Sequence, residues 1–413
     1  MHPTRREFIR GAAGSALFFL GADPLSSLLA RGPGLDNDGI LVLLQLSGGN
    51  DGLSTVIPYG DPAYARNRRR TRVQEQEMIQ LDAHVALHPN LKGFGKLFKE
   101  GHLAVVQGIG YPNPNRSHFK SLDIWHAASP RGRSEGTGWI GRFVDTAFAG
   151  SDDPNLVIHV GNRIPFSLTA AVHRPVAFTT PEAYRWTGTT REEMALAAAA
   201  PICEHEASPA TRVERPSKGR DRALERMRKV LREAQASSQT VREAAARYRP
   251  KVEFPRSPIA TNLATVAALI SGGLGTRVYS VEMGGFDTHV NQKGRHDNLM
   301  NQLDGALTAF YRDLEKRGLA DRVCIFAFSE FGRRVRENGS GGTDHGVAGQ
   351  AFLIGGRVKG GLHGRYPSLT ELQKGDLVHT VDFRSVYATI IDRHFGADHK
   401  VVLGRRWKML PLI

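Results

Sequence analysis

Two apolar runs of strand length, separated by one long helical pattern, constrain the fold more than any other feature of the sequence. Residues 277–283 and 322–328 are rich in β-branched and aromatic side chains, a composition typical of strands. Between them, in residues 292–318, leucines recur at helical spacing on one face. A strand, a helix and a strand in this order form a β-α-β unit with parallel strands in one sheet. We therefore predict an α/β fold with a doubly wound, mostly parallel sheet and helices on both faces.

Each of these two runs ends at a loop that carries a carboxylate. Asp287 and His289 follow the first run, and Glu330 follows the second. A Gly-rich loop then leads to Asp344 and His345. In open parallel sheets, ligands bind at the carboxyl ends of the strands. The sequence therefore predicts a metal or oxyanion site at this edge of the sheet.

Residues 40–46 form a third apolar run that ends at an acidic loop. Its continuous apolar sequence is typical of a strand in the middle of a parallel sheet. The loop 47–52 that follows carries Asn50 and Asp51. Taken alone, Asp51 would be interpreted as a helix cap; alongside the two later strand ends, we predict a ligand role. The loop lacks both dinucleotide-binding glycine spacing and a P-loop lysine, which argues against a nucleotide-phosphate loop.

A fourth strand, predicted over residues 103–110, is followed by Ser117 and His118. Pro112 and Pro114 exclude a helix before Ser117, which is a residue type that commonly caps helices. Its position at the carboxyl end of a strand also suits a catalytic nucleophile. The two roles are compatible, and both stay open.

Residues 185–255 differ in composition from the rest of the chain, and we predict that they form a helical insertion or lid. The segment is first alanine-rich, then polar with prolines, and finally highly charged with a narrow apolar face. Its arginines are interpreted as a solvated helix face, because aromatic residues are sparse and no nucleic-acid-binding module is recognisable.

The N-terminus has the pattern of a twin-arginine export signal. Arg5 and Arg6 precede a short apolar run diluted by Gly and Ala. We assign residues 1–31 to the signal peptide and residues 32–413 to a single α/β domain. We therefore expect the twin-arginine export machinery as a partner, and the periplasm or cell surface of a bacterium as the location.

Composition limits the possible partners. The 413 residues carry a formal net charge of +14, which suits anionic substrates. No apolar run reaches the roughly 18 residues that a membrane-spanning helix requires, so we expect no transmembrane helix in the mature chain. Two cysteines cannot form a disulfide framework.

With these residues placed, the chain resembles the twin-arginine-exported domain-of-unknown-function family 1501, within the alkaline-phosphatase and sulfatase-like superfamily. The resemblance extends over most of the mature chain and omits the predicted insertion. The stretches that carry it are residues 47–52, 115–125, 285–289, 329–333 and 343–346.

The resemblance implies roles for individual residues. Asp51 resembles the first metal ligand of the superfamily, and Ser117 resembles its nucleophile, with His118 beside it in the catalytic pair. Asp287 and His289 resemble a ligand pair, whereas Glu330 occupies a strand end where the superfamily has Asp-His. Either His345 replaces the late histidine of the superfamily, or Asp344 and His345 together replace the displaced pair. We further expect substrate binding by Asn50, Arg116 and Arg333.

These roles imply an exported, metal-dependent hydrolase or transferase. It would act through a serine nucleophile on phosphate or related esters of an anionic small molecule or polymer. One or two divalent ions, zinc, manganese or calcium, would serve as cofactor. Sulfatase chemistry of the formylglycine kind is excluded, because Pro112 occupies the position of the required cysteine. The alternative is a non-catalytic exported surface or binding protein that retains the fold and a structural metal.

Overall fold

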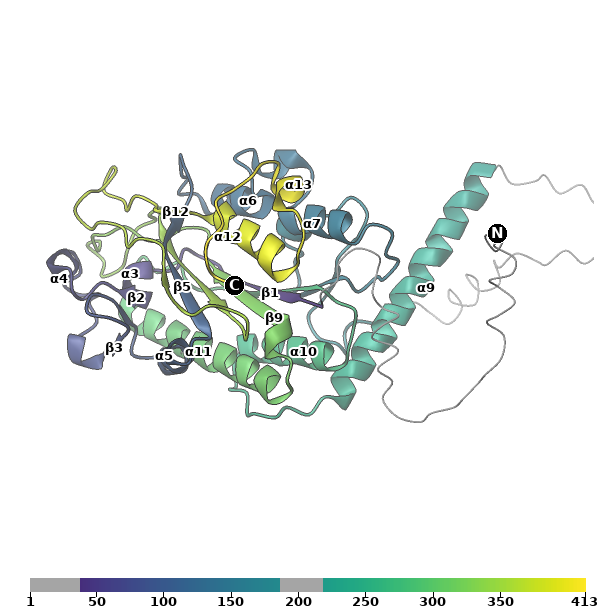
Figure 1. The fold of residues 1–413 in the computed structure, drawn as a ribbon, viewed down its shortest axis with the longest axis horizontal. Helices are drawn as coiled ribbons and strands as arrows, with labels where there is room; N and C mark the ends of the chain where they lie inside the picture. The colour runs from purple at the N-terminus through teal and green to yellow at the C-terminus, as the bar shows by residue number, and fades with distance from the viewer. Residues whose placement is uncertain (1–37, 186–217) are drawn as a thin grey trace, which may run out of the picture. The chain divides into compact units, whose positions relative to one another are not determined.

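The computed structural model describes residues 38–185 and 218–413 (Figure 1). The predicted signal peptide, residues 1–31, lies outside these described residues. So does the part of the predicted insertion that spans residues 186–217.

A nine-stranded sheet forms the centre of the described domain, with the order β11-β5-β10-β9-β1-β8-β6-β7 and with β12 also paired to β5. Its strands are β1 (Ile40–Leu46), β5 (Leu103–Gly110), β6 (Val157–Val160), β7 (Val176–Phe178), β8 (Val278–Met283), β9 (Val323–Phe328), β10 (Gly349–Ile354), β11 (Gly361–His363) and β12 (Val381–Asp382). Strand β10 is antiparallel to both of its neighbours, and the other pairs are parallel. The prediction of a mostly parallel sheet is confirmed.

The predicted β-α-β unit is present as β8, α11 (Gln292–Lys316) and β9. Its two strands lie on either side of β1, where Leu44 pairs with Val281 of β8 and with Ala327 of β9. Helix α11 therefore crosses over β1 and covers one face of the sheet. The leucines that predicted this helix are buried against the sheet.

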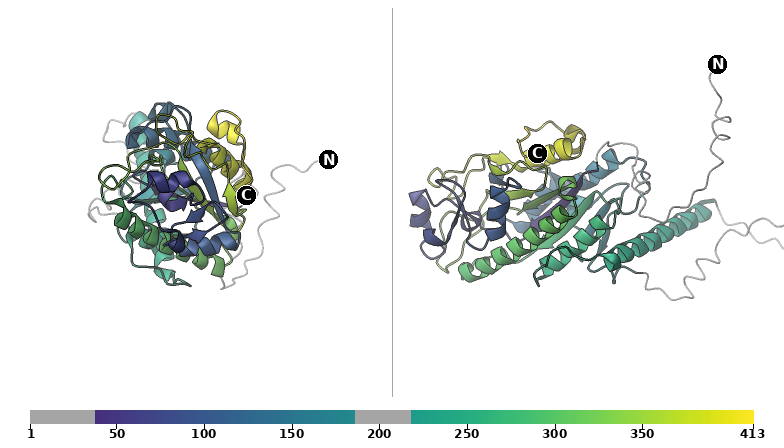
Figure 2. Two further views of the ribbon diagram at one scale, coloured as in Figure 1. Left: turned by 90° about the vertical axis from the view of Figure 1, so that its left-hand side faces the viewer. Right: turned by 60° about the horizontal axis from the view of Figure 1, so that its bottom comes forward.

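Alternate residues of β1 point to opposite faces of the sheet, as the pleat requires. Val42 and Leu44 belong to one apolar cluster, with residues of α5 (Lys92–Lys99), α10 (Pro258–Ser271) and α11. Leu41 and Leu43 belong to a second cluster, with residues of α6 (His118–Ala127), α7 (Trp139–Ala147), α12 (Phe383–Thr389) and α13 (His399–Leu403). Figure 2 shows these two helical layers on either side of the sheet. Helices on both faces were predicted, and they are confirmed.

Smaller elements complete the described fold. A three-stranded sheet consists of β2 (Val56–Ile57), β4 (Ala86–Leu87) and β3 (Ile79–Gln80). Two short helices, α3 (Gly52–Thr55) and α4 (Pro62–Asn67), lie near it in the chain. Single helical turns occur at Glu75–Glu77, Gly132–Glu135, Phe166–Leu168, Ala320–Arg322 and Ile390–His394.

Helix α9 (Lys218–Arg247) lies in the predicted insertion, residues 185–255. Near its C-terminal end, Val241 and Ala244 are buried in the same apolar cluster as α10. Just beyond the helix, the Tyr248 hydroxyl donates to Asp313 over 2.9 Å. The last part of the segment is therefore packed into the domain.

Among the helices of residues 38–185 and 218–413, none combines the length and the apolar character that a membrane crossing demands.

Candidate metal centre

Four loops that carry predicted site residues meet at one edge of the sheet. Asp287 follows β8, Glu330 follows β9, and His118 lies beyond the end of β5. Because β10 is antiparallel to β9 and β5, its beginning lies where those strands end, and the loop before it carries His345. The strand topology thus brings together residues that are up to 227 positions apart (345 − 118).

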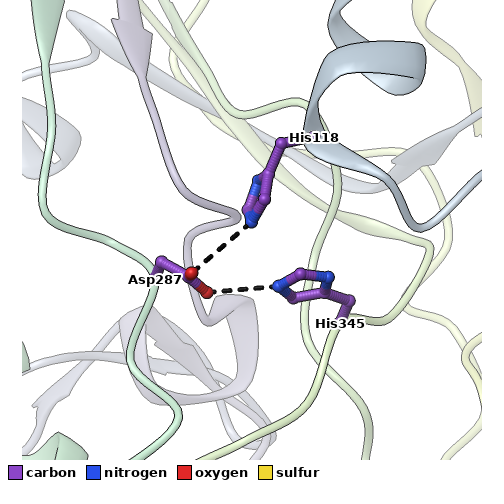
Figure 3. Close-up of side chains that lie close together, drawn as sticks. All are labelled: His118, Asp287 and His345. Carbon is purple, nitrogen blue, oxygen red and sulfur yellow. Dashed lines mark hydrogen bonds and ion pairs between the residues drawn. The ribbon is translucent and has the colours of Figure 1, made fainter.

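His118, Asp287 and His345 form the candidate metal cluster. They offer one ligand atom each, and these atoms all lie within 4.8 Å of one another (Figure 3). His118 Nε2 is 3.7 Å from Asp287 Oδ2, and His345 Nε2 is 3.2 Å from Asp287 Oδ1. We call these three residues the cluster.

The orientation of the His118 ring is set by Glu330. His118 Nδ1 lies 2.6 Å from Glu330 Oε1, and this hydrogen bond raises the pKa of His118 above its usual value. His118 Nε2 is a buried atom without a hydrogen-bond partner in the described part of the chain. In the neutral ring, Nδ1 donates to the carboxylate and Nε2 presents its lone pair toward Asp287. Metal-bound histidines usually have such a carboxylate on the second ring nitrogen.

The buried Glu330 carboxylate is itself fixed by one main-chain and one side-chain donor. Its Oε1 accepts a hydrogen bond from the Gly48 amide over 2.9 Å, and its Oε2 accepts one from the Ser329 hydroxyl over 3.0 Å. The sequence predicted Glu330 as a metal ligand. In the structure its carboxylate contacts the second nitrogen of His118, so it positions a ligand of the cluster.

His345 has the same arrangement with a different acceptor. Its Nδ1 donates to the carbonyl of Arg116 over 2.9 Å. The neutral ring therefore has its lone pair on Nε2, the atom that faces Asp287. Burial lowers the pKa of His345, which favours the neutral form that a metal requires.

His289 is a fourth donor at the cluster. Its Nε2 lies 2.9 Å from Asp287 Oδ1 and 2.9 Å from His345 Nε2. On the other side of the ring, Nδ1 lies 3.4 Å from Asp344 Oδ1. A hydrogen bond from Asn338 lowers the pKa of Asp344. Asp344, predicted as a ligand, is thus positioned to orient His289.

Arg333 holds Asp287 and the surrounding loops. Its buried guanidinium donates to Asp287 Oδ1 over 2.7 Å and to the carbonyls of Gly49, Phe286 and Thr343 at 2.7–3.0 Å. Burial alone would raise the pKa of Asp287, but hydrogen bonds from Arg333 and His345 outweigh it and lower that pKa to about 2. The donors of Arg333 point at the protein itself. The substrate-binding role that the sequence predicted is therefore not the one this geometry supports.

Asp51 is not brought into the cluster. Its buried carboxylate accepts hydrogen bonds from Arg68 Nη1 and Nη2, the latter over 3.0 Å, and from Ser54 Oγ over 2.8 Å. It also caps α3 by accepting from the Leu53 amide. Burial would raise the pKa of Asp51, but the charge of Arg68 dominates and lowers it. The capping role left open by the sequence is present, together with a buried ion pair that the sequence did not predict.

The remaining predicted site residues lie around the cluster. Asn50 is buried within its loop, where its backbone N–H donates to Ser329 Oγ over 2.9 Å and its side-chain Oδ1 accepts from the Thr55 hydroxyl over 3.0 Å. Arg116 pairs with the carboxylate of Asp376. Ser117 is exposed at the N-cap position of α6, but its hydroxyl makes no capping hydrogen bond. The serine hydroxyl is thus not committed to the capping role.

The donor set of the cluster fits zinc or manganese. Imidazole nitrogens and one carboxylate are the usual ligands of zinc, and imidazole and carboxylate also bind manganese. Calcium takes six to eight oxygen ligands, so the calcium alternative does not fit these residues. Half of the Asp287 side chain is exposed (49%), which leaves the cluster open to solvent.

A second group of potential ligands, formed by Asp392, Asp398 and His399, has no free imidazole nitrogen. His399 Nδ1 lies 2.8 Å from Asp392 Oδ1, and His399 Nε2 accepts a hydrogen bond from the Trp407 amide over 3.1 Å. Both ring nitrogens are used, so this group stabilises the C-terminal segment.

Comparison of the sequence with models of known protein families identifies a match. The model of the family DUF1501, described as proteins of unknown function, matches residues 40–409. The chain belongs to the DUF1501 family. This membership bears out the resemblance to family 1501 seen in the sequence. No curated protein matches the chain.

Solved structures resemble this DUF1501 chain only weakly. The lipoteichoic acid synthase LtaP from Listeria monocytogenes is 8% identical, with 82% of this chain and 72% of that chain covered and a TM-score of 0.30. Ps i-CgsB is 10% identical, with 91% and 75% covered and a TM-score of 0.34. BT1596, a 2-O GAG sulfatase, is 8% identical, with 78% and 65% covered and a TM-score of 0.31.

Proposed function

We propose that the chain is an exported, metal-dependent hydrolase or transferase that acts on phosphate or related esters of anionic substrates. The observation that carries the proposal is the convergence of His118 Nε2, Asp287 and His345 Nε2. The second nitrogen of each ring is already held, by Glu330 and by the Arg116 carbonyl. Both imidazoles are therefore preorganised as ligands.

The residues at the site would have distinct roles. His118, Asp287 and His345 would hold the ion, and His289, whose Nε2 lies 2.9 Å from Asp287 Oδ1, would border the position left for water or substrate. When bound, such an ion polarises a phosphoryl oxygen and activates a nucleophile. Ser117 supplies that nucleophile, because its exposed hydroxyl is adjacent in sequence to His118 and makes no capping bond. The N-terminus of α6, a helix of 10 residues, carries a partial positive charge that favours an anionic substrate beside Ser117.

The openness of the cluster favours catalysis over the alternative of a binding protein with a structural metal. Structural zinc sites are closed by four protein ligands, whereas catalytic sites keep a position for water or substrate. Here the carboxylate of Asp287 is half exposed, and the cluster lies at the carboxyl ends of the strands, where α/β proteins bind ligands.

Metal content and turnover, measured on the same variants, test the proposal. We expect the protein to bind zinc or manganese and to hydrolyse p-nitrophenyl phosphate or bis(p-nitrophenyl) phosphate. Asp287→Ala and His345→Ala should lose the metal by elemental analysis. Ser117→Ala should keep both metal and thermal stability while it loses turnover. Ser340→Ala, at another exposed loop serine, is the matched control.

Two outcomes would count against the proposal. If Asp287→Ala and His345→Ala both keep the metal, the cluster is not the metal site. If the metal-loaded protein turns over neither ester class, the non-catalytic binding protein becomes the better account of the chain.

A further inference from the structure

Three adjoining hollows lie in a row on the surface beside the cluster. The first, of about 630 Å³, lies between residues 112–116 and 373–379. The second, of about 390 Å³, shares Pro112, Asn113 and Asn115 with the first. The third, of about 520 Å³, shares Pro130, Arg384 and Arg405 with the second. We call this row of three hollows the basic groove.

The basic groove begins next to the cluster. Arg116 lines the first hollow, and its carbonyl accepts the hydrogen bond of His345 Nδ1. Val347, two residues beyond His345, lines the same hollow. A polymeric ligand that lies in the groove can therefore present one of its chemical groups to the cluster.

Positive charge exceeds negative charge along the groove. Three of its cations are balanced by carboxylates: Arg116 by Asp376, Arg384 by Asp382 and Arg131 by Glu135. Arg142, in the third hollow, donates to the main-chain carbonyls of Val402, Thr137 and Ala127. Three further cations have no ion pair within residues 38–185 and 218–413: Lys374 in the first hollow, Lys120 in the second, and Arg405 in the second and third. Surplus positive charge is thus distributed over the row, in contrast to a single phosphate pocket.

The far end of the groove is fixed by stacking. The guanidinium carbon of Arg405 lies 3.9 Å from the centre of the Trp407 ring, and that of Arg384 lies 4.2 Å from it. These contacts hold the Arg405 charge on the rim of the third hollow. Because Trp407 already contacts two guanidinium groups, it does not offer the free aromatic face on which nucleic-acid bases stack.

Polar amides line the first hollow. Asn113, Asn115 and Gln373 line it, and side-chain amides carry both donors and acceptors, a combination that suits hydroxyl groups. Asn115 Oδ1 already accepts a hydrogen bond from the Ser117 backbone amide over 2.8 Å, so Asn115 contributes chiefly its NH₂ donors. The groove therefore offers hydroxyl-binding groups next to the cluster and unpaired cations at intervals beyond it.

We propose that the basic groove binds a linear saccharide polymer that carries phosphate or sulfate groups, and that such a polymer is the substrate presented to the cluster. This inference rests on the proposed function for the claim of turnover. It does not depend on that function for the claim of binding, which can be measured separately.

Charge reversal tests the groove directly. The groove variant combines Lys120→Glu, Lys374→Glu and Arg405→Glu. The matched control combines Lys92→Glu, Lys99→Glu and Arg256→Glu, three exposed cations outside the groove with the same total change in charge. The probe is fluorescein-labelled dextran sulfate, with binding followed by fluorescence anisotropy at low and physiological salt.

We expect the full protein to bind the probe, and the groove variant to bind about tenfold more weakly or worse at low salt, since three attractive charges become repulsive. The control variant should lose much less affinity. Equal losses in both variants would overturn the proposal by showing that only net charge matters. Tighter binding of a single-stranded oligonucleotide than of dextran sulfate would also overturn it, in favour of a nucleic acid.

The outcomes separate this inference from the proposed function. If small esters are hydrolysed but dextran sulfate does not bind, the groove proposal fails alone. If dextran sulfate binds through the groove but no ester is hydrolysed, the proposed function fails and the groove remains as a binding site. Metal content and thermal midpoint, measured for both variants, show whether any loss reflects unfolding.

Discussion

His118 Nδ1 lies 2.6 Å from Oε1 of Glu330, a carboxylate whose side chain is 1% exposed. This contact joins the loop after β9 to the first residue of α6. It determines which nitrogen of His118 faces Asp287. Glu330 was predicted as a metal ligand, but in the structure it orients the candidate ligand His118.

Glu330→Gln should weaken metal binding by about 10-fold to 100-fold, the range typical for loss of a ligand-orienting carboxylate. Glutamine retains the size of the side chain but removes its charge, so the His118 ring loses its charge-assisted hydrogen bond. Competition with a chelator measures the affinity. Glu337→Gln, at another carboxylate outside the cluster, is the control. Complete loss of metal, equal to that of Asp287→Ala, would indicate that Glu330 is a direct ligand.

Asp51→Ala should destabilise the protein without removing the metal. Its carboxylate and the Arg68 guanidinium are both fully buried, and removal of one partner from a buried pair typically costs about 3–5 kcal/mol. Urea denaturation and elemental analysis measure the two effects. The double variant Asp51→Leu with Arg68→Met should recover part of the lost stability. Metal loss with unchanged stability would instead support the ligand role predicted from the sequence.

The strands and the β-α-β unit could be predicted because apolar runs and helical spacing are local properties of the sequence. The hydrogen-bond and ion-pair partners of long polar side chains could not be predicted in this way. Arg68 lies in a stretch with Arg66, Arg69, Arg70 and Arg72, and nothing local indicates which of these folds inward onto Asp51. The buried position of Arg68 also depends on contacts that are distant in sequence, since its guanidinium donates to the carbonyls of Val335 and Arg334.

The direction of β10 was a second property that local sequence did not reveal. Only the antiparallel pairing of β10 with β9 and β5 brings the preceding His345 to the site edge. The sequence predicted candidate site residues by their type and their position after strands. Their division into ligands and orienting groups depended on side-chain directions, as Glu330, Asp344 and Arg333 show.

Stability should fall as the pH is lowered from about 6.5 toward 4, in part because of buried neutral histidines. Burial lowers the pKa of His126 and of His394 to about 4. Between that value and about 6.5, the ordinary pKa of histidine, the unfolded chain binds protons that the folded chain does not. Each such histidine then removes about 1.4 kcal/mol of stability per pH unit of acidification. Urea denaturation at pH 7, 5.5 and 4.5 measures the slope.

His394→Gln isolates one of these contributions. The His394 ring donates from Nε2 to the Ile40 carbonyl over 3.0 Å, and the amide of glutamine can keep that bond without a titrating group. We expect a shallower dependence of stability on pH in this window. His84→Gln, at an exposed position, controls for the loss of a histidine. A slope identical to that of the parent protein would exclude His394 as a contributor.

The export proposal predicts that replacement of Arg5 and Arg6 by Lys retains the protein in the cytoplasm. Recognition of this type of signal depends on the guanidinium pair, and lysine conserves only the charge. Cell fractionation and immunoblotting measure the distribution, with a substitution of Arg10 by Lys as control for a third basic residue of the same segment. Normal export of the double variant would contradict the proposed route.

The last prediction separates two parts of the predicted insertion. Deletion of residues 192–230 should leave stability nearly unchanged, whereas deletion of residues 192–250 should lower it by several kcal/mol. The longer deletion removes the buried Val241 and Ala244, and a buried valine side chain alone contributes roughly 1.5–3 kcal/mol. It also removes Tyr248, which donates to the fully buried Asp313.

Two point variants within α9 test the same distinction without a deletion. Val241 is fully buried, whereas Val230, three turns earlier on the helix, is 58% exposed. Val241→Ala removes two buried methyl groups and should cost about 2 kcal/mol. Val230→Ala should change stability by no more than about 0.5 kcal/mol, as is usual at the surface. Urea denaturation compares the two. Equal effects of the two variants would mean that the C-terminal turns of α9 do not pack on α10, and the longer deletion should then be tolerated as well.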